Sequence, residues 1–284
     1  LPVDVNKSVA DFGVEGKNIR FGFNAVKSMG RPTITAIIEE RTNNGDFHSM
    51  QDFITRMAGV LNKRTVEHLI LAGAFDTFGN TRRGMMNVYE RMIDSAVKQN
   101  KDAISGQMSL FDLVSEEDKK SLEMKVPDIQ EFDKEDLLER EKEVLGVYVT
   151  GHPLDEYTGM WEKHISARST DFLVDEETGE TKAADSTKQT IGGLVRNIKV
   201  NTTKTGQQMA YLTIEDFVGT VEVILFPRSY EKNRRILDTT NKVFVTGRVQ
   251  ANVNAEAKLI ADSLVSFESV PKRLWLRFDS LAVY

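Results

Sequence analysis

The sequence predicts an α+β chain of more than one domain, in which a helical region is followed by a five-stranded β-barrel. Apolar residues recur at helical spacing through residues 24–99, and they alternate at strand spacing from Thr190 onward. The length of 284 residues also suits about two domains.

The composition excludes several kinds of site. There is no cysteine, which rules out disulfides and cysteine-bound zinc and is compatible with the cytoplasm, where we expect the protein. No apolar run approaches the roughly 18 residues that span a bilayer, and the N-terminus does not resemble a signal peptide. Because the chain starts with Leu1 rather than methionine, we expect it to be part of a longer protein.

Charge is distributed unevenly along the chain, although the net charge is only −6. Residues 112–189 carry 22 acidic and 10 basic side chains, whereas residues 1–106 carry 14 basic and 12 acidic ones. Residues 190–268 are also slightly basic, with 10 basic and 8 acidic side chains. The acidic total therefore does not argue against nucleic-acid binding by the two flanking regions.

The chain begins with a predicted β-hairpin over 9–23, where apolar and polar residues alternate on either side of a glycine turn. Residues 24–41 then predict two helices that are separated by a tight turn at 27–32. The asparagines and glycine of 43–46 predict a loop after the second helix.

A second unit of the same layout follows. Ser49 is expected to cap a helix, which ends in a turn at 58–62. Asn62 is expected to cap the next helix, and Gly73 to end it. A further amphipathic helix is predicted over 84–99.

Two such units in tandem are typical of helix-hairpin-helix motifs. A tight turn before a helix exposes backbone N–H groups that suit the phosphates of duplex DNA, and glycine lets the backbone approach closely. The predicted duplex-binding residues are Lys27, Gly30, Arg31, Asn62, Lys63 and Arg64. The alternative is an ordinary helical bundle whose turns happen to contain glycine and lysine.

A short apolar segment interrupts the polar linker that we expect over 101–133. Its sequence, Gln-Met-Ser-Leu-Phe, matches the Gln-x-x-Leu-Phe pentapeptide with which bacterial replication proteins bind the sliding clamp. The adjacent leucine and phenylalanine would fill a hydrophobic pocket. The predicted clamp-binding residues are Gln107, Met108, Leu110 and Phe111. The alternative is a chance match whose aromatic side chain folds onto its own domain.

Residues 134–188 predict a connecting helix and a linker. The charged helix is expected over Lys134–Val144, with glutamates such as Glu141 on a solvated face, and Leu145–Val149 is expected to be extended. The four histidines are scattered, and no metal site, nucleophilic triad or phosphate-binding loop is recognisable. We therefore predict no catalytic residue.

The barrel is predicted by five strand-like segments: Ile191–Val200, Gln208–Asp216, Thr220–Phe226, Lys242–Val249 and Lys258–Val265. A helix is expected over 229–241, and one helix after the third strand is the layout of an OB-fold. OB-folds bind oligonucleotides on a sheet face and its loops, on or beside which Arg228 also lies. Tyr211 and Phe226 could stack on bases. The predicted single-strand-binding residues are Arg196, Lys199, Lys204, Tyr211 and Arg248. The alternative is a barrel that binds protein.

Several segments resemble the alpha subunits of bacterial replicative DNA polymerase III, in the same order and over essentially the whole chain. They are Ile19–Lys27, Leu61–Arg64, Leu71–Asp76, Gln107–Phe111, Glu141–Gly146, Gly151–Leu154 and Thr203–Ala210. The resemblance implies the end of the fingers at 1–23, the tandem helix-hairpin-helix region at 24–100, a linker with the clamp motif at 101–133, a connecting helix and linker at 134–188, the OB-fold at 189–268 and the start of a tau-binding domain at 269–284.

The resemblance also implies a function. The longer protein would be a DNA-directed DNA polymerase whose partners are duplex and single-stranded DNA, the sliding clamp and the clamp-loader tau subunit. Its catalytic carboxylates and magnesium would lie outside this chain, which would hold no cofactor and would support processive synthesis. The family's Gly-hydrophobe-Gly turn is Ser28-Met29-Gly30 in this sequence. A non-catalytic clamp-binding scaffold and a nuclease or repair subunit remain as alternatives.

Overall fold

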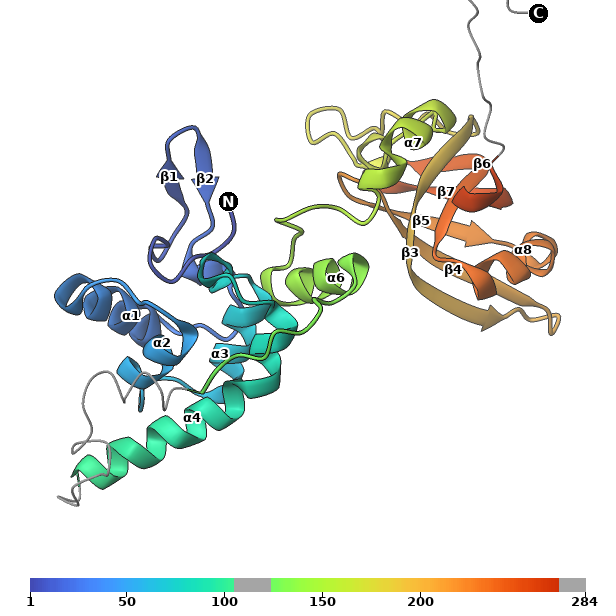
Figure 1. Cartoon of the computed structure of the whole chain (residues 1–284). Coiled ribbons are helices and arrows are strands. Elements are labelled where there is room, and N and C mark those ends of the chain that lie inside the picture. The colour runs from blue at the N-terminus through green and yellow to red at the C-terminus, as the bar shows by residue number, and fades with distance from the viewer. Residues whose placement is uncertain (105–123, 271–284) are drawn as a thin grey trace, which may run out of the picture. The chain divides into compact units, whose positions relative to one another are not determined.

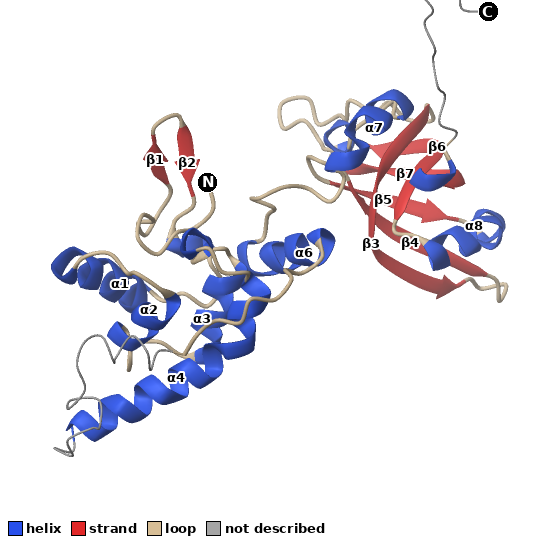
Figure 2. Ribbon diagram, in the orientation of Figure 1, coloured by secondary structure: helices blue, strands red, loops and turns tan. Residues whose placement is uncertain are grey.

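A computed structural model of the chain describes residues 1–104 and 124–270, and it separates into two compact units. Unit 1 comprises Leu1–Pro153 and is mainly helical, whereas unit 2 begins at Leu154 and contains a β-barrel (Figures 1 and 2). The predicted fold class, a helical region followed by a five-stranded barrel, is confirmed.

Unit 1 contains, in the described residues, a short β-hairpin, five α-helices and two 3-10 turns. Its elements are β1 (Gly13–Glu15), β2 (Asn18–Arg20), the 3-10 turn η1 (Phe23–Ala25), α1 (Arg31–Asn44), α2 (Met50–Arg56), α3 (Lys63–Leu71), the 3-10 turn η2 (Asp76–Phe78), α4 (Arg82–Ile104) and α6 (Lys134–Leu145). The predicted caps are confirmed, since the side chains of Ser49 and Asn62 accept hydrogen bonds from the first turns of α2 and α3.

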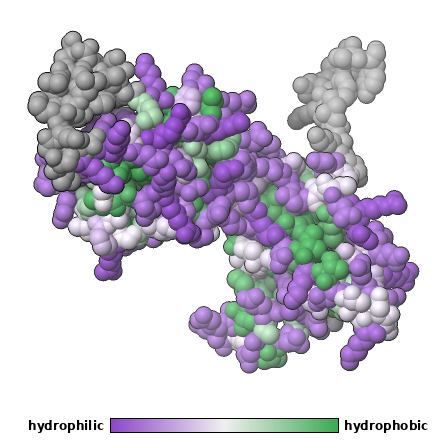
Figure 3. Space-filling model, turned by 90° about the horizontal axis from the view of Figure 1, so that it is seen from below, coloured by the Kyte–Doolittle hydropathy of each residue, from purple (hydrophilic) through white to green (hydrophobic). Residues whose placement is uncertain are grey.

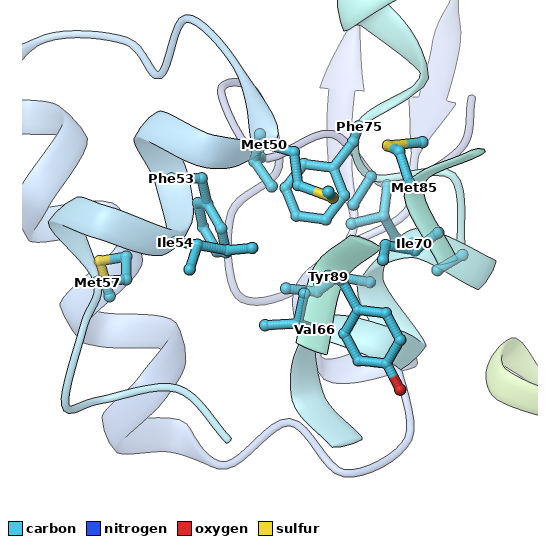
Figure 4. Packing of buried hydrophobic residues seen from close by; sticks show 14 of the residues in the cluster. Met50, Phe53, Ile54, Met57, Val66, Ile70, Phe75, Met85 and Tyr89 are labelled. Carbon is cyan, nitrogen blue, oxygen red and sulfur yellow. The ribbon is translucent and has the colours of Figure 1, made fainter. Parts of the chain in front are cut away.

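The core of unit 1 gathers side chains from α2, α3, α4 and the loops between them. Met50 and Phe53 of α2 face Ile70 of α3 and Met85 of α4, and the ring of Phe75 packs edge-on against Phe53 at 5.1 Å (Figure 4). Burial of large apolar side chains of this kind stabilises a fold by about 1.5–3 kcal/mol each. The core therefore holds the turn between α2 and α3 in place.

Three expectations about unit 1 are wrong in detail. The helix expected before the first turn is only the 3-10 turn η1, because Gly22 and Val26 on either side have extended backbones. Helix α4 continues through residues 100–104, whose polar composition suits an exposed helix as well as a loop. Residues 145–149 are not one extended segment, because Leu145 is the last residue of α6 and Gly146 takes the left-handed conformation with φ of 80°.

Unit 2 is a closed barrel with short helices around it. Its elements are the 3-10 turn η4 (Asp155–Tyr157), α7 (Thr158–His164), the 3-10 turn η5 (Ser169–Phe172), β3 (Lys188–Thr202), β4 (Gln208–Glu215), β5 (Thr220–Leu225), α8 (Pro227–Thr239), β6 (Lys242–Asn252), β7 (Ala255–Ser266) and the 3-10 turn η6 (Phe267–Ser269). The strand order is β3-β4-β5-β7-β6, and only β5 and β7 run parallel. The five predicted strands and the helix between the third and the fourth are thus confirmed.

Strand β3 closes the barrel because it is long enough to serve two neighbours. Its first half, from Lys188 to Leu194, pairs with β6, and its second half, from Leu194 to Thr202, pairs with β4. Figure 2 shows this strand running along the whole length of the barrel. The far end of the β3–β4 hairpin is consequently exposed on both faces, since Ile198 and Lys199, which point to opposite faces, are both exposed.

The segment before the barrel is not the simple linker that the sequence suggested. Trp161 of α7 is buried and donates a hydrogen bond from its indole nitrogen to the carbonyl of Gly192 at 2.6 Å. Ser169 of η5 donates from its backbone and hydroxyl to the buried carboxylate of Asp216, at 2.7 and 2.6 Å. Residues of 154–188 therefore pack against the barrel, because their few large apolar side chains are enough to cover one side of it.

Candidate nucleic-acid interface

The turn between α2 and α3 has the geometry of a helix-hairpin-helix turn. Gly59 has φ of 92°, which favours glycine, and Asn62 accepts a hydrogen bond from the N–H of Thr65 at 2.9 Å. Asn62 was predicted both as a cap and as a DNA contact, and its side-chain oxygen is engaged in the cap. The N–H groups at the start of α3 are left beside the two cations that follow, Lys63 and Arg64.

These two cations are in different states. Lys63 is bridged by two carboxylates of α4, with its ammonium nitrogen 3.1 Å from Glu90 and 3.1 Å from Asp94. The hydrogen bonds from Asp94 and then Glu90 raise the pKa of Lys63. Arg64 is exposed and makes no side-chain hydrogen bond or ion pair within the described part of the chain. Arg64 is therefore the cation of this turn that is open to a phosphate.

The first turn lies between η1 and α1. Ser28 takes the left-handed conformation here, with φ of 67°, whereas Gly30 caps α1 with an ordinary φ of −86°. A Cβ atom on Gly30 would meet only a Pro32 side-chain carbon at 3.7 Å, so the fold itself does not require glycine. Arg31 is the first residue of α1, is exposed, and has no side-chain partner among the described residues.

Lys27 fixes the first turn to the rest of unit 1. Its ammonium donates to the carbonyl of Glu143 at 2.5 Å, and its N–H donates to the carbonyl of Val144 at 2.9 Å. Its own carbonyl lies 2.7 Å from Nδ1 of His68, in the middle of α3. Lys27 thus connects the first turn to the helix that begins at the second turn, and part of its hydrogen-bonding capacity is used within the protein.

A buried charge cluster that the sequence did not reveal supports this arrangement. Arg82 donates two hydrogen bonds to Asp76, at 3.0 and 2.6 Å, and lies 3.4 Å from Glu141. Glu141 is 0% exposed and accepts hydrogen bonds from Val149 and Thr150, so its expected place on a solvated face is wrong. The cluster ties the start of α4 to α6.

The outer face of the barrel brings three of its five predicted residues onto one band of strands. Tyr211 points outward, because its neighbours Ala210 and Leu212 are buried in the barrel. It lies opposite Lys199 on β3 and opposite Ile224 on β5. Ile224 pairs with Ile260, which in turn lies opposite Arg248.

The other two predicted residues lie elsewhere. Lys204 is exposed in the turn that joins β3 to β4, beyond the paired part of the hairpin. Arg196 sits at a bulge in β3 near the other end of the β3–β4 pair, where it forms an ion pair with Glu215. Its ion pair and its distance along the strand separate Arg196 from the band of Lys199 and Tyr211.

The sequence indicated only part of the surface beside α8. Phe226 and Arg228 were noted as lying beside the strands, but Arg234 was not considered, and all three line one open groove at the start of α8. Arg228 and Arg234 both lie in the first two turns of α8, and Phe226 directly precedes that helix. The three side chains lie close together because the chain turns from β5 into α8. The spacing of charged residues in the sequence does not predict this turn.

Other expectations concern parts of the chain outside this description. Two predicted sites lie outside the described residues: the predicted clamp-binding residues Gln107, Met108, Leu110 and Phe111, and the expected tau-binding segment after residue 270. Within residues 1–104 and 124–270, no three histidine, aspartate or glutamate side chains gather in a way that could hold a metal ion. In the same residues, no helix has both the length and the apolar character needed to cross a bilayer.

Comparisons with known proteins agree with both halves of this description. The family model described as a helix-hairpin-helix motif matches residues 1–85, and the one described as an OB-fold nucleic acid binding domain matches residues 189–266. The DNA polymerase III alpha subunit of Borreliella burgdorferi is 32% identical over 94% of this chain. The chain is a relative of the DNA polymerase III alpha subunits.

Two further relatives of this kind illustrate the extent of the match. The DNA polymerase III alpha subunit of Thermus aquaticus is 33% identical over 98% of the chain, and that of Saccharopolyspora erythraea is 33% identical over 88%. The chain spans 23, 22 and 21% of the length of the Borreliella, Thermus and Saccharopolyspora alpha subunits, respectively. Both units therefore resemble one segment of these polymerase III alpha subunits.

Proposed function

We propose that this chain is the DNA-binding and clamp-binding segment of a bacterial replicative DNA polymerase. The observation that carries the proposal is the match to DNA polymerase III alpha subunits over nearly the whole chain, through both units. Polymerisation and its magnesium ions would belong to the remaining length of such a protein, in the cytoplasm. Residues 1–153 would hold duplex DNA, and the barrel would lie on the single-stranded template.

We propose that the two turns of unit 1 bind phosphates of duplex DNA, without preference for base sequence. The N–H groups at the starts of α1 and α3, together with Arg31 and Arg64, offer donors and positive charge at both turns. Gly30 leaves open space in front of the first turn, which suits close approach of a phosphate.

The proposed tether is the pentapeptide Gln107–Phe111, which would bind a sliding clamp. A tether of this kind raises the effective concentration of the polymerase at its template, so dissociation interrupts synthesis less often. The tau subunit of a clamp loader would bind further toward the C-terminus. Each of these partners is proposed from the motif and from the relatives' identity.

Replacement of the two open arginines tests the duplex contact. Arg31→Gln/Arg64→Gln is expected to lower the slope of log affinity against log salt by about 1.8, because each lost phosphate contact on B-DNA removes about 0.9. The measurement is fluorescence anisotropy of a labelled duplex at several salt concentrations. Arg83→Gln/Lys125→Gln removes the same charge from exposed residues outside both turns. An equal change of slope in both variants would contradict phosphate binding at the turns.

The carboxylates that hold Lys63 give a second prediction. Glu90→Gln/Asp94→Asn is expected to strengthen duplex binding and to steepen the salt slope by about 0.9, because the ammonium is released for one more phosphate. Lys63→Gln in the same background separates this effect from the general loss of negative charge. A gain in affinity that persists without Lys63 would contradict the proposal that the two carboxylates compete with a DNA phosphate for this ammonium.

A further inference from the structure

The groove beside α8 has the chemistry of a site for one nucleotide of a single strand. It has a volume of about 780 Å³ and is lined by the start of β4, by Phe226 and by the first two turns of α8. Phe226 is 48% exposed, which makes it one of the large apolar side chains that the barrel unit leaves in contact with solvent. Figure 3 shows hydrophobic surface on the face of unit 2 that it displays, bordered by hydrophilic side chains.

The backbone of Phe226 at the edge of this groove is restricted by the proline that follows it. Pro227 is the first residue of α8 and restricts the residue before it to an extended conformation, in agreement with φ of −64° and ψ of 162° at Phe226. The ring is half-exposed in the absence of a ligand, and a flat, half-exposed aromatic face is what a nucleobase stacks on.

Polar groups of the groove lack partners within the described part of the protein. Tyr230 lines the groove with 8% of its surface exposed, and its hydroxyl makes no hydrogen bond to any described residue. Arg228 is exposed and likewise makes no ion pair there. Arg234 has only a 4.0 Å pairing with Asp238, in which both side chains are more than 60% exposed, so it is weakly held.

The groove also continues from the outer face of the sheet. Phe226 follows β5 two residues after Ile224, the residue that lies opposite Tyr211. Alternate residues of an extended chain point to the same side, so Phe226 and Tyr211 belong to one surface. A strand that stacks on Tyr211 would therefore reach the groove with its next bases.

We propose that this groove binds one nucleotide of single-stranded DNA, with the base stacked on Phe226 and the adjacent phosphates held by Arg228 and Arg234. The hydroxyl of Tyr230 and the amides of Gln207 and Gln208 supply hydrogen bonds to the base or sugar. Glu231 is the acidic residue of the lining and accepts from a donor on the base edge, such as N3–H of thymine. This subsite rests on the proposed function of the barrel and extends its contact surface from the sheet to α8.

The test uses the full 284-residue chain and two fluorescein-labelled twelve-residue probes, oligo-dT and an oligomer of abasic sites with the same number of phosphates. Phe226→Leu is expected to weaken oligo-dT binding about fivefold or more and to leave binding of the abasic probe unchanged, because only a base can stack. Arg228→Gln/Arg234→Gln is expected to lower the salt slope for both probes by about 1.4.

Lys232→Gln/Arg235→Gln is the matched control, because it removes the same charge from α8 at exposed positions that do not line the groove. A smaller effect of this control, with the base-dependent loss in Phe226→Leu, supports the subsite. The subsite is contradicted if Phe226→Leu leaves oligo-dT binding unchanged, or if the two double charge variants weaken it equally. Binding of a single strand on the sheet face would then remain a separate proposal. If the wild-type chain does not bind oligo-dT at low salt, the single-strand role of the barrel fails together with the subsite.

Discussion

Glu141→Leu is expected to lower the free energy of unfolding of unit 1 by about 3–5 kcal/mol, because it leaves the partner of a buried ion pair without its counter-charge. The side chain of Glu141 accepts hydrogen bonds from the N–H groups of Val149 and Thr150 and from the Thr150 hydroxyl. All three donors would lose their acceptor at once, and Arg82 would keep only Asp76 and the carbonyl of Leu71.

Urea denaturation followed by far-ultraviolet circular dichroism measures this loss, since most of the described helical residues belong to unit 1. Glu143→Leu, an exposed position on the same helix, is the control and is expected to change stability by no more than about 0.5 kcal/mol. Arg82→Met/Glu141→Leu is expected to recover part of the loss, because a matched apolar pair replaces a buried ion pair at little cost. A single variant as stable as the wild type would show that the cluster is not needed.

Gln107→Ala/Leu110→Ala/Phe111→Ala is expected to weaken binding to a bacterial sliding clamp by about 100-fold or more. The reason is that two adjacent apolar anchors would carry the proposed contact, and truncation of one such anchor typically costs about 2 kcal/mol or more. Surface plasmon resonance of the full chain over an immobilised clamp measures the affinity of the wild type and the variant.

Ser109→Ala changes a position that the Gln-x-x-Leu-Phe pattern leaves free, so it is expected to keep wild-type affinity. Binding that survives in the triple variant, or that is absent from the wild type, would make the pentapeptide a coincidence. The duplex-binding proposal for unit 1 would then still stand on its own test, because it involves different residues.

The sequence allowed the barrel to be predicted almost completely, because its five strands alternate clearly and its turns contain glycine. The caps at Ser49 and Asn62 were also predictable, since capping depends only on neighbours three residues away. The strands and the helix caps both depend on residues close together in the sequence, which is why they could be predicted.

What the sequence did not reveal depends on partners far along the chain. Glu141 has the same spacing as the exposed glutamates on either side of it, and it differs from them by its contacts with Arg82, 59 residues earlier, and with Val149 and Thr150. The carboxylates that bind Lys63 lie 27 and 31 residues later in the chain. The sequence therefore did not show whether this lysine is ion-paired within the protein or available to a phosphate. The groove at Phe226 likewise arises where the start of β4 meets α8 in space.

The buried cluster around Arg82 also sets an order for the synthesis of the chain. Arg82 leaves the ribosome long before Glu141. The two N–H groups that donate hydrogen bonds to the carboxylate of Glu141 belong to residues 149 and 150. Until Glu141 has been made, Arg82 lacks one of the carboxylates that surround it in the folded protein. Unit 1 therefore cannot reach its final packing while residues 1–104 alone have been made, and it becomes a finished domain only when its last ten residues emerge.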